Sequence, residues 1–224
     1  MCGLNILAGN SGAGKSTFGL QMILNTLIAG NPACIMCSDQ KLSGQGQFMW
    51  SNHTGTQIKD LQEFSDERFA MSEWPLQFYE GQFELSAILS SIRLKAARGV
   101  RWFLIDYLGL IQYSDAPNQH ERKEHITECL KRLSHELQLY TMLISRGTKV
   151  GQNERPSLRH VEGGAGVSNA ADQVWWFEAD HANPPDVHRV EFLNLKSRQS
   201  GISQLVIKLE GKIHRFSNWP IFPV

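Results

Sequence analysis

Residues 9–16 read Gly-Asn-Ser-Gly-Ala-Gly-Lys-Ser and fit the phosphate-binding pattern GxxxxGK[ST], the feature that most constrains the fold. This pattern stands between a strand and a helix, and the apolar run Leu4–Ala8 and the helical pattern Ser16–Ile28 supply both. Gly12 and Gly14 allow the backbone to turn its N–H groups inward around phosphate groups. The sequence therefore predicts an α/β unit with a nucleoside triphosphate site at this loop, which we call the P-loop.

The side chains of the P-loop provide the other groups that such a site needs. Lys15 supplies a point charge for the β and γ phosphates, and the Ser16 hydroxyl can hold Mg²⁺. A glycine-rich turn that binds no phosphate is the alternative interpretation, and the flanking strand and helix argue against it. The residues predicted to contact the nucleotide are Gly9, Asn10, Ser11, Gly12, Ala13, Gly14, Lys15, Ser16 and Thr17.

The composition is that of one globular α/β domain, because 42% of the 224 residues are hydrophobic, 20% are charged and the formal net charge is zero. A polyanionic partner therefore has to be bound by a local basic patch. The sequence has no signal peptide, no apolar run that could cross a membrane and no secreted-type cysteine framework, so we expect a reduced, cytoplasmic setting. The cysteines are Cys2, Cys34, Cys37 and Cys129.

Two groups of residues could in principle bind a metal, but their spacing in the sequence does not favour a metal site. Cys34 and Cys37 lie in a strand pattern, where residues three apart face opposite sides, so chelation between them is not expected. His120, His125 and His135 lie on or near one helix without the i, i+4 spacing of a two-histidine metal site, and we expect them on the surface.

Apolar strand patterns alternate with helical patterns along most of the chain, which predicts a mainly parallel sheet flanked by helices. The last fifty or so residues alternate as strands instead and predict an antiparallel extension. Between the two parts, Gly147 to Ala170 is expected to be a long loop rich in glycine and charge. The expected parallel strands after the first are Ala33–Ser38, Leu76–Tyr79, Trp102–Asp106, Thr141–Ser145 and Gln173–Glu178. The later helices are a partly helical stretch at 41–64, Ser86–Ala97 and Glu121–Leu137, and the antiparallel strands are Val187–Leu195, Gln204–Leu209 and Lys212–Phe216.

Asp106 is the next residue with a predicted functional role, because it ends the apolar strand Trp102–Ile105. In open α/β sheets ligands bind at the carboxyl ends of the strands, where this carboxylate would meet Mg²⁺ beside Ser16. An aspartate at a strand end is also common as a helix cap or turn former. Behind a P-loop, we interpret it as the Walker B aspartate.

Several motifs follow one another in a particular order along nearly the whole chain. They are the P-loop, Phe103-Leu104-Ile105-Asp106-Tyr107-Leu108, a helix starting Glu121-Arg122-Lys123, a strand ending at Ser145, a stretch from Arg155-Pro156 through Gly163-Gly164 to Asp172, and Lys196-Ser197-Arg198 followed by Gly201. In this order and spacing the chain resembles the RecA-like motor domain of bacterial DnaB helicases and of phage primase-helicases. Apart from the P-loop, no motif is specific alone.

The resemblance implies a single RecA-like ATPase domain over residues 1–224, with ATP and Mg²⁺ as cofactors. It implies a ring-forming enzyme, a hexamer in the full-length parent, that translocates on single-stranded DNA and unwinds duplex. Because the sequence starts at the P-loop strand, no amino-terminal primase or collar domain is expected.

Lys196 and Arg198 match the Lys-x-Arg motif of the family at a strand end. There, the resemblance implies, they reach across a subunit interface and place positive charge on the γ-phosphate of the neighbouring site. In isolation, two basic residues at a strand end are usually solvated surface.

The expected loop after Ser145 carries a local excess of positive charge, with Glu154 and Glu162 as its acidic members. Such a loop could hold a phosphate backbone without reading bases, and an exposed loop without DNA is the alternative. At Arg146 the resemblance implies a Gln or His that senses the γ-phosphate and relays to the DNA loop. Arginine could still contact phosphate, but the different side chain leaves this coupling open. The predicted DNA-binding residues are Arg146, Lys149, Arg155 and Arg159.

Gln40 falls where the related helicases carry the glutamate that polarises the attacking water. Glutamine cannot accept a proton as a base, so the neighbouring Asp39 substitutes, Gln40 orients water, or hydrolysis is slow. Two other functions stay open: a RecA-type recombination or repair ATPase, and a nucleotide-binding regulatory module with impaired hydrolysis, which the Gln40 substitution makes conceivable.

Overall fold

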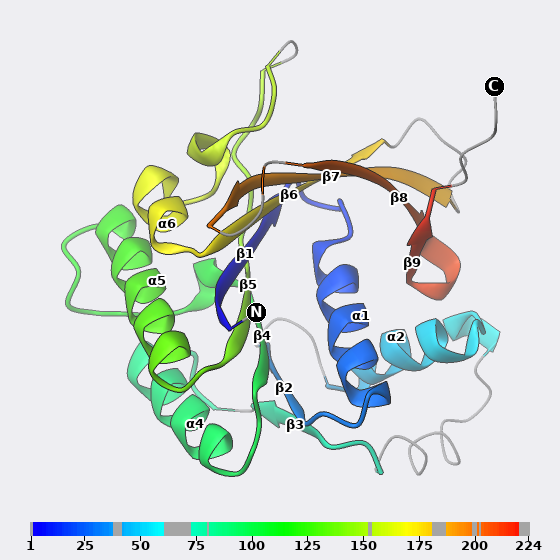
Figure 1. The fold of residues 1–224 in the computed structure, drawn as a ribbon, viewed down its shortest axis with the longest axis horizontal. Coiled ribbons are helices and arrows are strands. Elements are labelled where there is room, and N and C mark those ends of the chain that lie inside the picture. Colours follow the sequence, from blue (N-terminus) through cyan, green and yellow to red (C-terminus); the bar gives the residue numbers. More distant parts are fainter. Residues whose placement is uncertain are drawn as a thin grey trace.

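The computed structural model describes residues 2–37, 42–60, 73–79, 81–151, 154–180, 187–198, 201 and 203–219. Within these ranges the strands form one nine-stranded sheet in the order β3-β2-β4-β5-β1-β6-β7-β8-β9 (Figure 1). No helix among the described residues is both long enough and apolar enough to span a bilayer. The α/β class predicted from the sequence is confirmed.

The first six strands of this order are parallel to one another, as the alternating pattern predicts. Buried side chains fill both faces of β1, which is why its sequence is a continuous apolar run rather than an alternating one. The carboxyl ends of these strands share one edge of the sheet. The strands are β3 (Leu76–Tyr79), β2 (Ala33–Cys37), β4 (Trp102–Asp106), β5 (Tyr140–Ile144), β1 (Gly3–Gly9) and β6 (Gln173–Asp180).

The predicted antiparallel extension is confirmed by β7 (Val187–Ser197), β8 (Gln204–Glu210) and β9 (Arg215–Asn218). The expected strand Lys212–Phe216 is wrong in its first half. There the chain makes a short 3₁₀ helix, η4 (Gly211–Ile213), and turns at His214 with a left-handed φ of 50°. The chain has to reverse direction between β8 and β9, and this turn occupies the residues that sequence patterning assigned to a strand.

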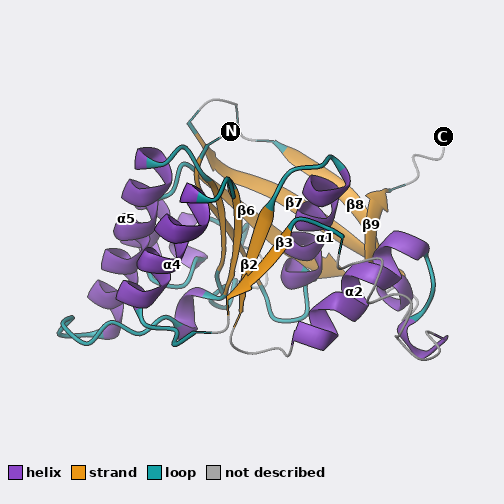
Figure 2. Ribbon diagram, turned by 90° about the horizontal axis from the view of Figure 1, so that it is seen from below, coloured by secondary structure: helices purple, strands orange, loops and turns teal. Residues whose placement is uncertain are grey.

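Helices cover both faces of the sheet (Figure 2). One face packs against α1 (Lys15–Ile28) and α2 (Leu42–Thr54), and the other packs against α4 (Leu85–Ala97), α5 (Gln119–Glu136) and α6 (Gly164–Ala170). Each face has its own buried cluster, so the sheet separates two hydrophobic cores. The predicted helices are confirmed to within two residues at their described starts, and α2 occupies part of the predicted stretch 41–64.

The stretch predicted as a long loop from Gly147 to Ala170 contains a short 3₁₀ helix, η3 (Leu158–His160), and helix α6. The prediction fails here because Gly, Ser and Asn dominate α6, and these residues have poor helix propensity. Tertiary packing forms the helix instead. Val167 is fully buried in the core, and the Ser168 hydroxyl donates to the carbonyl oxygen of Leu158 at 2.9 Å.

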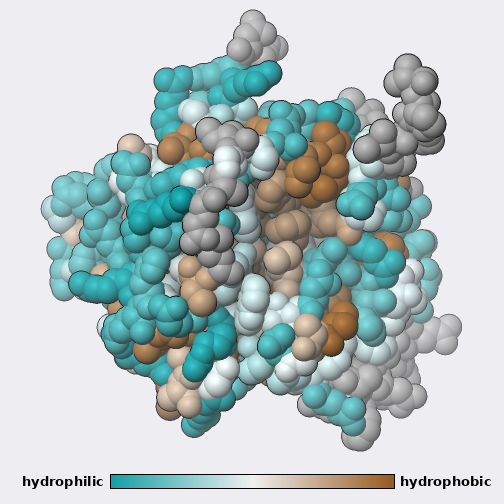
Figure 3. All heavy atoms as spheres, in the orientation of Figure 1, coloured by the Kyte–Doolittle hydropathy of each residue, from teal (hydrophilic) through white to brown (hydrophobic). Residues whose placement is uncertain are grey.

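Aromatic side chains join α1 to the antiparallel strands. The ring of Phe18 lies 5.0 Å from that of Phe177 and 5.9 Å from that of Phe192, measured between centroids. Figure 3 shows hydrophobic side chains gathered between these elements, while the surface over α5 is mainly hydrophilic. Trp175 and Trp176 pack into different clusters, which confirms that adjacent strand residues face opposite sides of the sheet.

Candidate nucleotide-binding site

The P-loop connects the carboxyl end of β1 to the start of α1, as its pattern predicts. Gly12 and Gly14 have φ angles of 78° and 87°, in the left-handed region that glycine adopts without strain. Gly9 has a φ of 144°, and a Cβ atom there would lie 2.2 Å from the carbonyl oxygen of Phe177. The backbone path of the loop therefore depends on glycine at these three positions.

Lys15 lies at the first position of α1 and is 8% exposed. Its Nζ donates to the carbonyl oxygens of Gly9 at 2.9 Å and Asn10 at 2.6 Å, so the ammonium group is held across the inside of the loop. Burial lowers the pKa of Lys15 to about 8, with the Asp106 carboxylate opposing this shift and the Arg146 guanidinium adding to it. The three side chains therefore act on one another electrostatically.

A cleft of about 330 Å³ lies over the P-loop at the carboxyl edge of the sheet. Among the predicted nucleotide contacts, Ala13 is buried instead of lining this cleft, and Gly9 and Asn10 turn carbonyl oxygens toward Lys15. Asp106 faces the cleft because β2 and β4 end together, with Cys37 and Asp106 paired in register. The cleft is lined by Ser11, Gly12, Gly14, Lys15, Ser16, Thr17, Cys37, Asp106, Tyr107, Ile144 and Arg146.

The groups in this cleft fit a magnesium nucleotide. Magnesium in nucleotide sites is commonly bound through one or two protein oxygens together with phosphate oxygens and water. The Ser16 hydroxyl and the Asp106 carboxylate line one cleft and supply oxygens of these kinds. Among the described residues, no group of three or more His, Cys, Asp or Glu side chains could hold a metal by itself.

Arg146 lies in the wall of this cleft, although its place in the sequence groups it with the predicted DNA-binding loop. Its guanidinium carbon lies 4.5 Å from the centre of the Tyr107 ring, a cation–π geometry. Tyr107 was not among the predicted site residues. Its position could have indicated it, because it directly follows Asp106 at the strand end where ligands bind.

The other predicted DNA-binding residues lie on the loop between β5 and α6. This loop is closed at its base by a bridge between Gly147 and Val161, and its arms extend away from the body of the molecule (Figure 1). The residues Lys149, Arg155 and Arg159 are exposed.

The acidic residues of this loop are partly neutralised by basic neighbours. Glu154 forms an ion pair with Arg159, and its Oε2 lies 3.5 Å from Nε2 of His160. Glu162 instead pairs with Lys123 of α5, with 2.7 Å between Nζ and Oε1. Glu162 is therefore fixed to α5 at the base of the loop, and its charge is balanced there.

Lys196 and Arg198 lie at the end of the sheet where the parallel strands begin, whereas the P-loop lies at the end where these strands finish. In register, Lys196 pairs with Val174, whose neighbour Gln173 pairs with Asn5 near the start of β1. The P-loop follows Gly9, four residues beyond Asn5 on β1 and roughly 13 Å away at about 3.3 Å per residue. These two basic residues therefore do not face the cleft of their own molecule.

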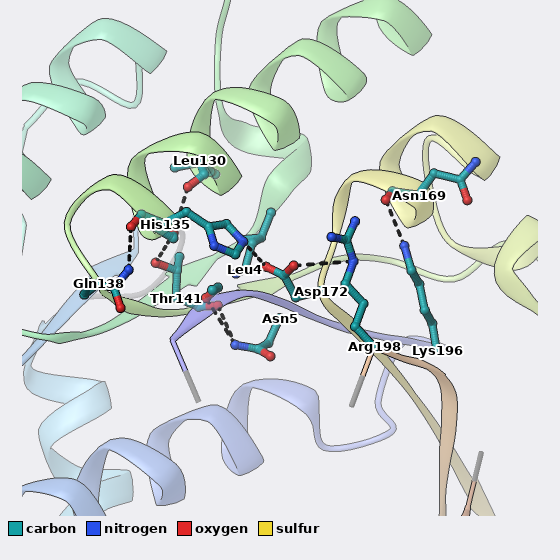
Figure 4. A network of polar contacts seen from close by, with 12 residues as sticks. Leu4, Asn5, Leu130, His135, Gln138, Thr141, Asn169, Asp172, Lys196 and Arg198 are labelled. Carbon is teal, nitrogen blue, oxygen red and sulfur yellow. Dashed lines mark hydrogen bonds and ion pairs between the residues drawn. The ribbon is translucent and has the colours of Figure 1, made fainter. Parts of the chain in front are cut away.

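Both basic side chains are held by groups of their own chain (Figure 4). Lys196 Nζ donates to the carbonyl oxygens of Ser168 at 2.9 Å and Asn169 at 2.8 Å, at the end of α6. Arg198 Nε lies 3.6 Å from Oδ1 of Asp172. Burial lowers the pKa of Lys196, repulsion from Arg198 and Lys131 adds to the shift, and the Asp172 carboxylate opposes it.

Asp39 and Gln40 lie outside the described residues, so the assignment of the hydrolytic residue stays a prediction from the sequence.

The chain is similar to known proteins in sequence and in fold. The profile of the family described as DnaB-like helicase C terminal domain matches residues 2–218. A probable replicative DNA helicase of Guillardia theta is 26% identical over 201 residues, covering 80% of this chain and 33% of the relative. The replicative DNA helicase DnaC of Bacillus subtilis is 26% identical over 134 residues, covering 56% of this chain and 30% of the relative. The chain thus spans about a third of the length of these curated relatives.

Solved structures show the same fold. One of them, described as an ATPase domain, superposes with a TM-score of 0.83 at 17% identity, covering 97% of this chain and 85% of that chain. A DnaB-like replicative helicase, whose structure was described with its interactions with primase, gives a TM-score of 0.84 at 16% identity. The second match covers 97% of this chain and 57% of that chain.

Proposed function

The chain belongs to the DnaB-like helicase C terminal domain family, and from this premise we propose that it is the ATP-hydrolysing motor domain of a replicative DNA helicase. In this proposal it acts on single-stranded DNA as part of a ring-shaped homo-oligomer, a hexamer in the full-length parent. The observation that carries the proposal is the cleft in which Lys15, Asp106 and Arg146 meet over the P-loop. A cytoplasmic location remains a prediction from the sequence.

Each side chain of the cleft has a role in this proposal. Lys15 binds the β and γ phosphates of ATP, and Ser16 and Asp106 hold Mg²⁺, which neutralises charge on the phosphates when bound. Arg146 lies on the same side and adds a second positive charge, which would favour the γ-phosphate. Asp39 or Gln40 would position the attacking water, with Asp39 as the group able to accept its proton.

Lys196 and Arg198 would complete the nucleotide site of a neighbouring subunit. Their position at the end of the sheet away from the P-loop supports this role, because they lie too far from their own P-loop to contact the phosphates of a nucleotide bound there. A guanidinium group donated by a neighbour stabilises charge that develops on the transferred phosphoryl group.

The exposed loop between β5 and α6 would carry the DNA contacts, through Lys149, Arg155 and Arg159. Phosphate contacts of this kind bind DNA without sequence preference and weaken as salt concentration rises. The ion pair between Arg159 and Glu154 reduces the charge available, so we expect this binding to be weak.

ATP hydrolysis measured with and without single-stranded DNA tests the proposal. We expect turnover that increases with protein concentration, as subunits assemble, and that single-stranded DNA stimulates. Tight ATP binding with no turnover at any protein concentration would instead favour the regulatory nucleotide-binding module, a candidate that Gln40 keeps open.

A further inference from the structure

We propose that Asp172 is the positioning residue that holds Arg198 for its action on a neighbouring nucleotide site, an inference that rests on the proposed role of Arg198. Asp172 is 7% exposed, whereas half of the Arg198 side chain that it contacts is exposed. A buried carboxylate therefore contacts the Nε of an arginine whose side chain is half exposed (Figure 4).

The Asp172 carboxylate is fixed by two other elements of the fold. Its Oδ2 accepts a hydrogen bond from the backbone N–H of Leu4, on β1, at 3.0 Å. The same oxygen lies 2.8 Å from Nε2 of His135, on α5, where the ring is the donor to an ionised carboxylate. These bonds leave Oδ1 as the oxygen that faces Arg198. The carboxylate is thus anchored through one oxygen and orients the guanidinium group through the other.

The backbone of β1 leaves room for this arrangement. A Cβ atom at Gly3 would lie 2.4 Å from Oδ2 of Asp172, so a larger residue would displace the carboxylate. Gly3 also has a φ of 133°, which other residues rarely adopt. The first residue of β1 therefore permits the contact between the strand and the carboxylate.

Asp172 holds Arg198 in a way that would still allow the guanidinium group to bind a phosphate. Asp172 contacts Nε, the nitrogen nearest the chain, and Figure 4 marks this as the contact between the two side chains. A guanidinium group has five donors in a planar fork, and its terminal nitrogens match the oxygens of a phosphate. Lys196 is held by carbonyl oxygens of α6, so Asp172 contacts Arg198 directly and acts on Lys196 only through its charge.

The substitution Asp172→Asn separates this role from a purely structural one. Asparagine has the same shape and can still accept from the N–H of Leu4, but it removes the negative charge that holds Arg198. We expect kcat for ATP hydrolysis to fall at least about tenfold, while KM and the Kd for ATP stay within about twofold. In the Arg198→Ala background, Asp172→Asn should have no further effect on kcat. Unchanged kcat, or losses that add in the double variant, would overturn the inference.

Mixing variants shows whether the Asp172→Asn protein is folded and where its defect acts. Its P-loop is intact, so mixing it with Lys15→Ala subunits, which retain Asp172 and Arg198, should restore part of the turnover. Mixtures that stay inactive would contradict the inference, since the defect would then lie in the variant's own site. If Arg198→Ala also fails to regain turnover in such mixtures, the proposed role of Arg198 fails. If only Asp172→Asn behaves unexpectedly, that role stands and the positioning role of Asp172 fails.

Discussion

Lys15 Nζ lies 2.6 Å from the carbonyl oxygen of Asn10, so the ammonium group that should bind phosphate is already held inside its own loop. In the proposed site, ATP would replace these carbonyl contacts with charged phosphate oxygens, which form stronger hydrogen bonds. We expect Lys15→Ala to weaken ATP binding about 100-fold, corresponding to about 2.7 kcal/mol, measured by calorimetry. The exposed Lys59, in the 3₁₀ helix Ile58–Asp60, provides a control in which Lys59→Ala should bind normally. Binding by Lys15→Ala within twofold of the parent would contradict the assignment of this site.

ATP affinity should also depend on pH, because burial lowers the pKa of Lys15 to about 8. Below that pH the ammonium form is present in the free protein. Above it the free protein loses the proton that phosphate binding needs, so affinity should fall about tenfold per pH unit. Titration with a fluorescent ATP analogue from about pH 7 to about pH 9.5 measures this, and Lys15→Arg, which does not titrate in that range, should give a flat profile.

Arg198→Ala should leave the Kd for ATP unchanged and lower turnover at least about 1000-fold, as for arginines donated by neighbouring subunits. Arg189→Ala is a matched control, because Arg189 lies on the same strand β7 and pairs with Glu191 away from the Arg198 end. Steady-state hydrolysis and calorimetry together give the result. Equal loss in both variants would indicate general damage to β7 instead of a role on phosphate.

Gln40→Glu should raise the rate of ATP hydrolysis if this position carries the missing base. Glutamate restores a group that accepts the proton of the attacking water, and general-base catalysis contributes about 100-fold or more. Gln47→Glu, in α2, adds the same charge at another site and should not change the rate. A Gln40→Glu protein no faster than the parent would indicate that Asp39 already serves as the base.

Gly147→Ala should destabilise the protein by about 1–3 kcal/mol, the usual cost of overpacking. A Cβ atom at Gly147 would lie 2.4 Å from the Trp176 ring and 3.0 Å from the carbonyl carbon of Gly9. At Gly151 the nearest atom is 3.4 Å away, at the flexible end of Glu154, so Gly151→Ala should cost little. Chemical denaturation of both variants tests this difference, and equal stability would contradict the tight packing behind the P-loop.

Strong local patterns in the sequence predicted much of this fold. The P-loop and the strand that ends at Asp106 were predicted because their chemistry and apolar patterning agree at the same residues. Helix α6 was missed because packing against the core, through Val167, outweighs the poor propensity of its residues. Arg146 was predicted to bind DNA and to be able to contact phosphate, but its cation–π contact with Tyr107 was not predicted, because that contact depends on how the ends of β4 and β5 lie side by side.

Long-range contacts were the least predictable part. His135 was expected on the surface, and 48% of its side chain is exposed, yet its ring bonds to Asp172, 37 positions later in the chain. Local periodicity contains no information about such a pair. The resemblance to a helicase family identified Arg198, but only the structure identifies the carboxylate beside it.

The P-loop and Arg198 lie at opposite ends of the sheet, so two different surfaces of each molecule carry them. A two-fold dimer joins like surfaces, so it cannot place the arginine of each molecule at the P-loop of the other unless both edges share one interface. A head-to-tail contact does so directly and repeats from one molecule to the next. Assembly through this contact has polarity, and one defective molecule then weakens two adjacent sites, its own and the one that it completes.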